Sequence, residues 1–564
     1  MFRKSRDSQG DLFSGILGQL GSRKQKLLED PNSWHNVFHK EVFQRIEEAP
    51  YAVLYHHNNG RPNASVRQLI SMMILKEGHG WSDEQLFDRC RFDIKVLLAL
   101  GNSNFDDSIP TESTYYEFRK LLGEYNEYHH TDLLQATFAQ ITASQVRVLN
   151  ISGKKIRMDS KLINSNIATS NRLHLIVEGV RKFIADHRIE TKSLALEAFA
   201  QDLLKALRKK TTSNILYALN GKKKKETLLQ LGGLIKCLLD HVKQGQNESY
   251  ELLARIYREQ YKEEKEEENN EGGDHGELRL KEPNEISSSS IQSIHDPDAA
   301  YRTKGNGKSK QTVSGFHANI TESCDSQDDV NLILDVEVVP ANICEDAFLE
   351  AAIDSSEAVL EKAHQTQATH IEEVIADGGY DSIENRNEML KEERGKLSIT
   401  KTKGAKRVYD IEETESGDYR IKHIITGIKC ELSYSKKAKK YIIHNPNGTK
   451  RYMSKEEIEN YINRQKIESN KDKESYNLRA NVESTIHQTF HRLKKRGKIV
   501  YRGQVKCLWY VISRALWVNM TRIKANNSLN DLCFAFLTTC AFIKSLSSKN
   551  ELHPNILIVK FITL

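Results

Sequence analysis

The sequence predicts a mixed α/β protein. We expect a mixed sheet flanked by helices, an all-α N-terminal domain before it, a helical insertion and a small β-rich insertion. Three observations predict this fold class. Apolar residues recur at helical spacing up to about residue 145. From 146 onward, strand-like runs come first in series and then alternate with helical patterns. Residues 171–285 and 402–470 interrupt that order with patterns of their own.

The N-terminal region, residues 1–145, has helical periodicity in its clearest stretches. In 65–101 the apolar residues lie three or four positions apart, as on one face of a helix. Ser82 followed by Gln85 resembles a capping box, which opens a helix. The segment 109–125 begins with Pro and Thr and continues as a further helix. The pattern fits a plain helical bundle and equally a bundle that presents a helix to DNA.

The second region, residues 146–525, has the pattern of a sheet covered by helices. Strands are predicted at 155–163, 313–323 and 330–342. A helix is predicted over 345–364. A short apolar strand within 370–382 then runs into Asp377 and two glycines. We expect the flanking elements to form one sheet, from which the two interrupting stretches are looped out.

The first interrupting stretch, 171–285, has leucines at helical spacing and ends in an acidic linker. Residues 263–285 carry ten Asp and Glu against three Lys and Arg, a composition typical of a solvated linker. The second, 402–470, is strand-like and has a hairpin signature at Asn447–Gly448. The tail, 526–564, is apolar with interspersed Ser and Asn, and its pattern indicates no role.

Composition excludes several protein classes. The chain has 564 residues, 83 Lys and Arg against 77 Asp and Glu, and a net charge of +6, as in a globular protein. The eight cysteines form no C-x-x-C pair, which argues against a disulfide framework or a zinc cluster. The most apolar run, 532–543, is shorter than the ~20 residues of a membrane span, so no membrane partner is expected. We expect a cytoplasmic protein.

Three carboxylates stand out by their context. Asp159 lies in a predicted strand, where a buried acid is costly unless it is paired or metal-bound. Asp377 follows a short apolar strand and precedes two glycines, the place where open α/β sheets put functional groups. Glu483 lies on a predicted helix over 473–496.

That helix has two neighbouring stripes of side chains. The apolar stripe consists of Val482, Ile486, Thr489 and Leu493. The flanking stripe consists of Tyr476, Arg479, Glu483, His487 and Lys494. One face can therefore anchor in a core, while the flank presents a carboxylate among cations. Such a flank suits a site where the acid holds a metal and the cations hold phosphate.

Three carboxylates are the ligands that Mg²⁺ and Mn²⁺ prefer. In two-metal phosphoryl transfer, such acids hold ions ~4 Å apart that activate the attacking oxygen and stabilise the leaving one. Each acid also has an ordinary interpretation. Asp159 suits a strand end or turn, Asp377 a helix cap, and Glu483 with Arg479 an i,i+4 pair on a solvated face.

The surroundings of these acids carry a resemblance. The segment 476–483, Y-N-L-R-A-N-V-E, has the spacing Y-x2-R-x3-E and resembles the signature of bacterial insertion-sequence transposases of the DDE type. ADGGYDS, 376–382, and RMDSKLI, 157–163, look like the segments around that family's second and first Asp. Further segments that resemble the family, in its order, are 60–75, 81–86, 110–122, 296–322 and 337–346.

The resemblance implies an RNase H-like catalytic domain behind a helical DNA-binding domain. It implies two Mg²⁺ ions, with Mn²⁺ as a substitute, held by Asp159, Asp377 and Glu483. Tyr476 and Arg479 would contact double-stranded DNA, at the transposon ends and in the target. Water would cut at the element's end, and the freed 3′-OH would attack the target. The family also implies a homodimer on DNA, because two ends must meet, and hence a place on the nucleoid.

The chain departs from the family's fuller signature, which has Lys seven residues after Glu; here that residue is Phe490. Nearby, 491–506 carries seven Lys and Arg and no acid, which favours contact with phosphates. Its ordinary interpretation is a solvated basic loop. The residues expected to contact DNA are Tyr476, Arg479, His487, Arg492, Lys494, Lys495, Arg496, Lys498 and Arg502.

Two other functions remain open on the sequence alone. The first is a metal-dependent DNA nuclease that cuts but does not join. The second is a degenerate copy that only binds DNA, which the unassigned tail favours and the presence of all three acids opposes.

Overall fold

The computed structural model describes residues 1–547 with gaps. The gaps are 5–15, 17, 19, 57–60, 105–106, 169–170, 190–197, 210, 218–220, 243–246, 265–276, 306, 308–309, 326–329, 366–368, 392–393, 416 and 470–472. Side chains are described for fewer residues; those of the last long helix, for example, are described up to Leu529. No helix in the described part of the chain is long and apolar enough to cross a membrane.

The N-terminal region is helical, as predicted. Its helices are α1 (Ser22–Glu29), α2 (Trp34–Glu41), α3 (Val66–His79), α4 (Asp83–Phe92), α5 (Ile94–Ala99), α6 (Glu112–His129) and α7 (Leu133–Leu149). The predicted capping box is confirmed, because Ser82 accepts from the Gln85 amide and Gln85 accepts in return from the Ser82 amide. Thr111 caps α6. Helix α3 is buried along nearly its whole length and forms the centre of this region's core.

The central sheet is mixed, and the predicted fold class is confirmed. Its strands are β1 (Lys155–Asn164), β4 (Ala300–Lys304), β5 (Gln311–Ser323), β6 (Ile333–Pro340), β7 (Glu373–Ala376) and β8 (Lys396–Ile399). On one side of β1, β5 runs antiparallel to it, and both β6 and β4 run antiparallel to β5. On the other side, β7 runs parallel to β1 and β8 parallel to β7. This arrangement is that of an RNase H-like sheet.

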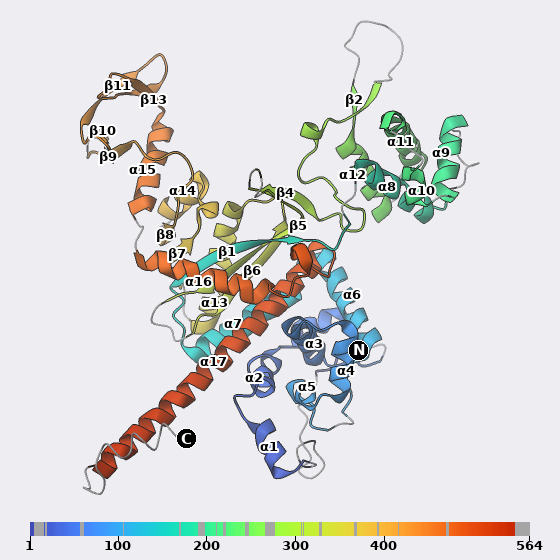
Figure 1. The fold of residues 1–564 in the computed structure, drawn as a ribbon, viewed down its shortest axis with the longest axis vertical. Coiled ribbons are helices and arrows are strands. Elements are labelled where there is room, and N and C mark those ends of the chain that lie inside the picture. Colours follow the sequence, from blue (N-terminus) through green and yellow to red (C-terminus); the bar gives the residue numbers. More distant parts are fainter. Residues whose placement is uncertain are drawn as a thin grey trace.

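Helices cover both faces of the sheet (Figure 1). On one face, α7 and α13 (Leu349–His364) pack together against β1, β6 and β7. On the other face lie α16 (Lys473–Phe490), which packs against β1 and β7, and α17 (Gln504–Ser547), which packs against β6. Helix α17 also packs against α2 and α3, so it joins the N-terminal helices to the sheet. The unassigned tail begins as the far part of this long helix, and its residues 548–564 lie outside the described residues.

The stretch 171–285 forms a separate helical unit. It contains α8 (Arg172–Asp186), α9 (Ala198–Lys209), α10 (Thr212–Tyr217), α11 (Gly221–Val242) and α12 (Glu248–Gln260). The unit has its own apolar core. Its acidic linker is partly ordered as a two-stranded ladder of β2 (Tyr261–Glu264) and β3 (Glu277–Leu280), where the sequence predicted only a linker. Residues 265–276 lie outside the described residues.

The stretch 402–470 forms a second separate unit. Its strands are β9 (Tyr409–Glu413), β10 (Tyr419–His423), β11 (Lys429–Ser435), β12 (Lys440–His444) and β13 (Lys450–Met453), followed by α15 (Lys455–Ser469). The strands make one antiparallel sheet with a core of its own. The predicted hairpin turn at Asn447–Gly448 is confirmed, and Gly448 has a φ of +82°, which favours glycine. Helix α14 (Ile383–Lys391) packs against both β8 of the central sheet and α15 of this unit.

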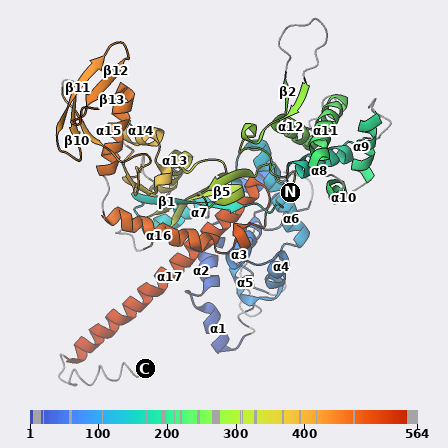
Figure 2. The same cartoon turned by 45° about the horizontal axis from the view of Figure 1, so that its top comes forward.

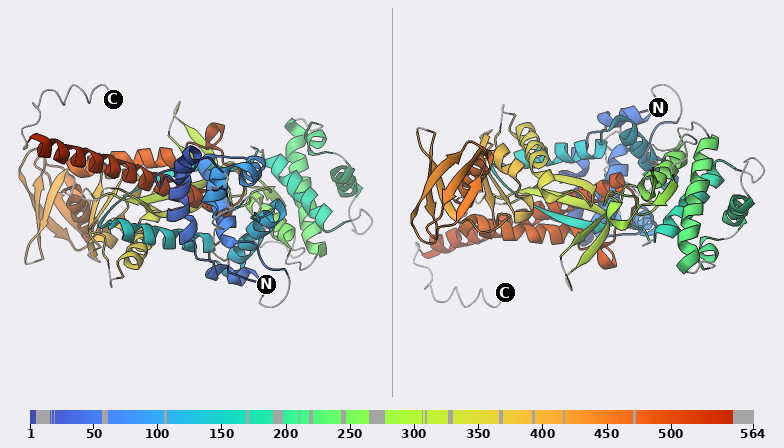
Figure 3. Two further views of the ribbon diagram at one scale, coloured as in Figure 1. Left: turned by 90° about the horizontal axis from the view of Figure 1, so that it is seen from below. Right: turned by 90° about the horizontal axis from the view of Figure 1, so that it is seen from above.

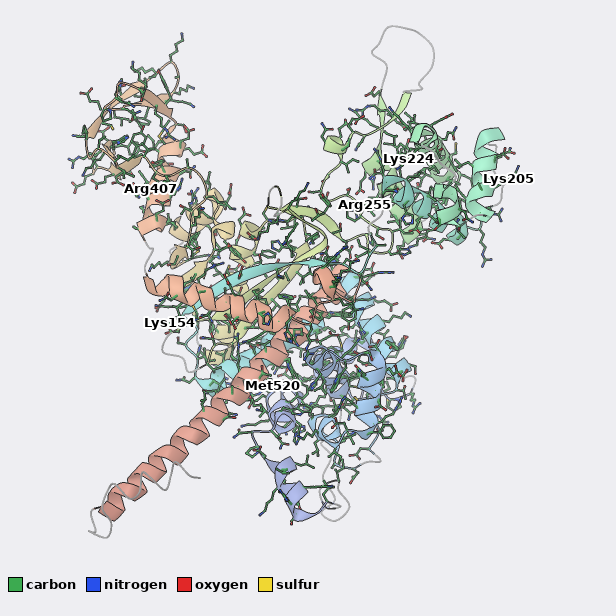
Figure 4. All side chains as sticks on the ribbon, viewed as in Figure 1. Lys154, Lys205, Lys224, Arg255, Arg407 and Met520 are labelled. Atoms are coloured by element: carbon green, nitrogen blue, oxygen red, sulfur yellow. The ribbon has the colours of Figure 1, made fainter. Side chains whose placement is uncertain are left out.

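The two inserted units stand on either side of the central sheet (Figure 2). Seen from above and below, they occupy opposite ends of the molecule (Figure 3). Lys205 and Lys224 mark the helical unit and Arg407 the base of the β-rich unit, all well away from Met520 on α17 (Figure 4).

Candidate active site

Two of the three predicted acids lie side by side because of the strand register. In the parallel ladder between β1 and β7, Arg157 is the partner of Ile375. Asp159 lies two residues further along β1, and Asp377 lies just past the end of β7, so the two acids lie near the same end of the ladder, close enough for the charge of one to act on the other. Burial raises the pKa of Asp159 to about 6; the Ser160 amide opposes that shift, and the charge of Asp377 adds to it. A cation placed between the two acids would relieve this cost.

The loop after Asp377 is shaped by its two glycines. Asp377 Oδ1 accepts from the Gly379 amide at 2.7 Å. A Cβ on Gly378 would collide with the Lys401 carbonyl oxygen, and one on Gly379 would collide with a Glu345 carboxylate oxygen. Neither position has room for a side chain. The glycines therefore fix the path of the chain behind the acid.

The third acid, Glu483, lies on α16 and reaches the pair through Arg479. The Arg479 guanidinium lies 3.9 Å from an Asp377 oxygen and 3.4 Å from a Glu483 oxygen. The Glu483 side chain is 65% exposed, so it is open to a ligand. Arg479 thus occupies the space between two of the three acids.

The apolar stripe of α16, which was predicted to anchor the helix in a core, packs against a core in the structure. Val482 and Thr489 are fully buried, and Ile486 and Leu493 pack against the core that the N-terminal helices share with α17. Phe490, at the position of the family's lysine, is also buried in that core, which explains why it is not a cation.

A buried ion network ties α16 to β1. Glu322 on β5 is fully buried and accepts from Arg157 Nε at 2.7 Å and from Arg522 at 2.6 Å. It also accepts from Thr485 Oγ1 at 2.8 Å. Arg157 in turn donates to the Leu478 carbonyl at 2.8 Å. Since Arg157 precedes Asp159 by two residues and Thr485 follows Glu483 by two, one carboxylate sets the position of two candidate catalytic acids.

A second buried ion holds the end of α16. The guanidinium of Arg514, on α17, is 1% exposed and donates to the carbonyls of Gln488 and Thr489. It also donates to the carbonyls of Glu77 and Gly78 at the end of α3, at 3.0 and 2.9 Å. Carbonyls at helix C-termini lack intrahelical partners and favour a cation. Arg514 therefore supplies hydrogen-bond donors to the last carbonyls of both helices, α3 and α16.

The prediction that the helix continues to 496 is wrong. Helix α16 ends at Phe490, and the chain then turns back, with a φ of +66° at Arg496. The cause is tertiary, because Arg514 captures the last carbonyls and the Lys494 amide donates to the Lys498 carbonyl at 2.8 Å. Lys494 consequently lies beyond the helix and does not continue the flanking stripe.

The other residues expected to contact DNA fall into two groups. Lys498 and Arg502 are engaged with the segment after β1, donating to the carbonyls of Ile167 and Asn166 at 2.6 and 3.0 Å. The second group is His487, Arg492, Lys494, Lys495 and Arg496, which are exposed, as is Arg502 of the first group. Tyr476 lies on α16, and its side chain is outside the described residues.

Sequence reasoning missed a polar cluster beneath the two aspartates. Glu345 accepts from Ser160 Oγ at 3.3 Å and from Lys304 Nζ at 3.2 Å. His317 lies 2.9 Å from the same Ser160 hydroxyl. Ser160 directly follows Asp159 on β1, and Glu345 abuts Gly379, so the cluster supports both β1 at Asp159 and the loop after Asp377. Glu345 lies within a segment that resembled the family, but no local pattern marked it as part of a site.

The donor set fits a hard divalent cation in part. Asp159 and Asp377 supply adjacent oxygens, the ligands that Mg²⁺ prefers. In the described part of the chain, no three His, Cys, Asp or Glu side chains are grouped closely enough to hold a metal. Glu483 stands apart because Arg479 lies between it and Asp377.

Comparison with protein families gives two matches. Residues 25–121, from α1 into α6, match a "Transposase domain (DUF772)". Residues 288–516, which include β4 to β8, Asp377, α16 and Glu483, match a "Transposase DDE domain". Asp159 precedes that second match, separated from it by the helical unit. No curated protein and no solved structure matches the chain.

Proposed function

This chain belongs to the DDE transposase family, and from that premise we propose that it cuts and joins DNA at the terminal inverted repeats of its own insertion sequence. The family is one of DNA-binding phosphoryl-transfer enzymes that use divalent metals. The observation that carries the proposal is the site itself. Asp377 follows the strand that pairs with the strand of Asp159, the charge of Asp377 acts on Asp159, and Arg479 lies between Asp377 and Glu483.

In this proposal Asp159, Asp377 and Glu483 hold two Mg²⁺ ions, for which Mn²⁺ can substitute. Bound there, the metal pair supplies activation of the attacking oxygen and stabilisation of the leaving oxygen. Arg479 and Tyr476 position DNA phosphates, and the exposed cations after α16 hold the backbone without reading its sequence. Because Arg479 already lies between two acids, a phosphate that attracts it also frees Glu483 for the metal.

Two displacements at phosphorus follow. In the first, water attacks at the element's end, the bond from phosphorus to the 3′ oxygen breaks, and a 3′-OH and a 5′-phosphate result. In the second, that 3′-OH attacks a target phosphorus and releases a target 3′-OH. Two ends must be held together for both to be inserted, so the acting form in this proposal is a homodimer on DNA.

The test uses the purified full chain, Mg²⁺ or Mn²⁺, DNA carrying the gene's own flanks, and a supercoiled target. We expect cuts at the repeat boundaries and joined products. We expect both to be lost in Asp159→Asn, Asp377→Asn and Glu483→Gln, while DNA binding persists. The control is Glu361→Gln, an exposed acid on α13, which should cut normally.

Other results of this cutting and joining assay would assign the protein a different function. Metal-dependent cutting without joined products would make the chain a nuclease. Binding of the flanks without any cutting would make it a DNA-binding relic. Normal cutting by any one acid variant would remove that residue from the site.

A further inference from the structure

A cleft opens in the N-terminal helical region, away from the candidate active site. Its volume is about 1180 Å³, and it lies where α3 and α6 begin, beside the first residues of the chain. Its walls include Ser65 and Gln68 at the start of α3, and Thr111 and Thr114 at the start of α6. Nothing in the proposed chemistry uses it.

The charge in the cleft is predominantly positive. Arg3, Lys4, Arg61 and Arg67 line it, and the first three are exposed. The acids are Glu117 and Asp107, and Asp107 Oδ2 already accepts from the amides of Ser103 and Asn104 at 2.7 and 2.8 Å. An anion entering the cleft would meet more cations than acids.

Two helix N-termini reinforce that charge. Helix α3 has 14 residues and is capped by Ser65, whose side chain accepts from the Gln68 amide. Helix α6 has 18 residues and is capped by Thr111, whose side chain accepts from the Thr114 amide. The N-terminus of a helix carries partial positive charge and favours phosphate.

A buried donor in the wall has no partner. Asn102 is 4% exposed and lines the cleft. Its Oδ1 accepts from Gln68 Nε2 at 2.7 Å, while its Nδ2 has no hydrogen-bond partner among the described residues. Buried hydrogen-bond donors nearly always have an acceptor, so a buried donor without one is unusual. A ligand with acceptor oxygens supplies the missing partner.

We propose that this cleft holds a backbone phosphate of the double-stranded DNA on which the enzyme acts. The inference rests on the proposed function and adds a second place where the chain grips its substrate. Arg3, Lys4 and Arg61 neutralise the phosphodiester, and Asn102 donates to it. Such a contact carries affinity and register but no base readout.

The experiment measures binding of a labelled duplex carrying the gene's own end over a range of salt. It compares the wild-type chain with the double variant Arg3→Ala/Arg61→Ala and with Asn102→Asp. Asn102→Asp keeps the acceptor for Gln68 but replaces the donor with a negative charge. The matched control, Arg23→Ala/Lys26→Ala, removes two exposed charges from α1 outside the cleft. Thermal unfolding confirms that each variant is folded.

We expect the double variant to bind about tenfold more weakly and to lose about 0.9 from the slope of log K against log salt, since one phosphate contact contributes roughly that much. Asn102→Asp should also weaken binding, and the α1 control should not. Equal affinity and slope in cleft and control variants, while the wild type still binds, would overturn this inference alone. A wild-type chain that binds no duplex would overturn the proposed function as well.

A separate arm identifies the source of the phosphate by thermal stabilisation of the wild type. Stabilisation by duplex that exceeds that by inorganic phosphate, and that is reduced in the double variant, supports the DNA backbone. Equal stabilisation by inorganic phosphate alone, lost in the double variant, would assign the cleft to a free anion and overturn the DNA assignment.

Discussion

At the scale of single residues, Asp159 shows that a buried candidate ligand lowers the stability of the folded protein. Burial raises its pKa to about 6, and the neighbouring Asp377 charge contributes to that shift. The ordinary pKa of Asp in an unfolded chain is ~3.9. The folded state therefore binds the proton more tightly, and ionised Asp159 destabilises the metal-free protein at neutral pH.

Asp159→Asn should for this reason stabilise the metal-free protein. The penalty is fully present above the folded pKa, falls as the pH drops below about 6, and vanishes below ~4, where both states are protonated. We expect the variant to be more stable than wild type by about 3 kcal/mol at pH 8, and equal to it at about pH 3. Urea unfolding in EDTA across this range measures the difference. A gain that did not change with pH would show that the ionised carboxylate is not its cause.

Predictions about single residues were confirmed where the interactions involve only residues close by in the sequence. The Ser82 box and the hairpin glycine depend on their own few neighbours, and both are present. Asp381 and Ser382 both precede α14, and it is the Ser382 hydroxyl that accepts from the Asn385 amide at the start of this helix. Asp381 pairs with Arg386 and is fully buried. Two polar residues in succession offer alternative caps, and only the tertiary partner decides between them.

At the scale of elements, α16 matters most because it carries Glu483 and Arg479. The amphipathic pattern predicted its buried face, but not the ions that hold it. Arg157, Glu322 and Arg522 are far apart in sequence, and their network forms only when β1, β5 and α17 are assembled. The early end of α16 has the same origin, since Arg514 comes from a later helix. Long-range ion pairs leave no periodic trace in a sequence.

Glu322→Gln should loosen α16 and destabilise the protein. It leaves the cations of Arg157 and Arg522 buried without a counter-charge, and breaking a buried pair typically costs about 3–5 kcal/mol. We expect a loss of about 3 kcal/mol, because Gln can still accept one hydrogen bond. Denaturant unfolding measures it, with Glu361→Gln on the surface of α13 as the matched control. A loss no larger than that of the control would mean that Glu322 does not hold the helix.

At the scale of the whole molecule, the chain is a central sheet with two units attached through narrow connections. The helical unit enters and leaves at adjacent points, because Arg172 donates to the Lys281 carbonyl at 2.7 Å. The β-rich unit is closed in a similar way by Thr402 and Glu468. The sequence predicted both interruptions from their changes of pattern. It did not predict that α17 packs against the N-terminal helices as well as the sheet, because one apolar helix face does not reveal its partners.

Residues 171–295, which include the core residues Ile291 and Ile294, should fold when expressed alone. The unit has its own buried core and its two ends meet. We expect a helical circular-dichroism spectrum and a cooperative melt, and we expect Leu253→Ala, at a fully buried position, to lower stability by about 3 kcal/mol. The same substitution in the full chain should leave the melt of the central sheet unchanged. A fragment without a cooperative transition would show that the unit depends on the sheet.

The double capping by Arg514 has a geometric consequence for the distance between two parts of the molecule. Helix α3 begins at the N-terminal cleft and ends at the carbonyls that Arg514 joins to α16. Its 14 residues rise about 1.5 Å each, so the rod is about 21 Å long. Because Arg514 holds the end of α3 against the last turn of α16, it fixes how far the N-terminal cleft lies from the helix that carries Glu483.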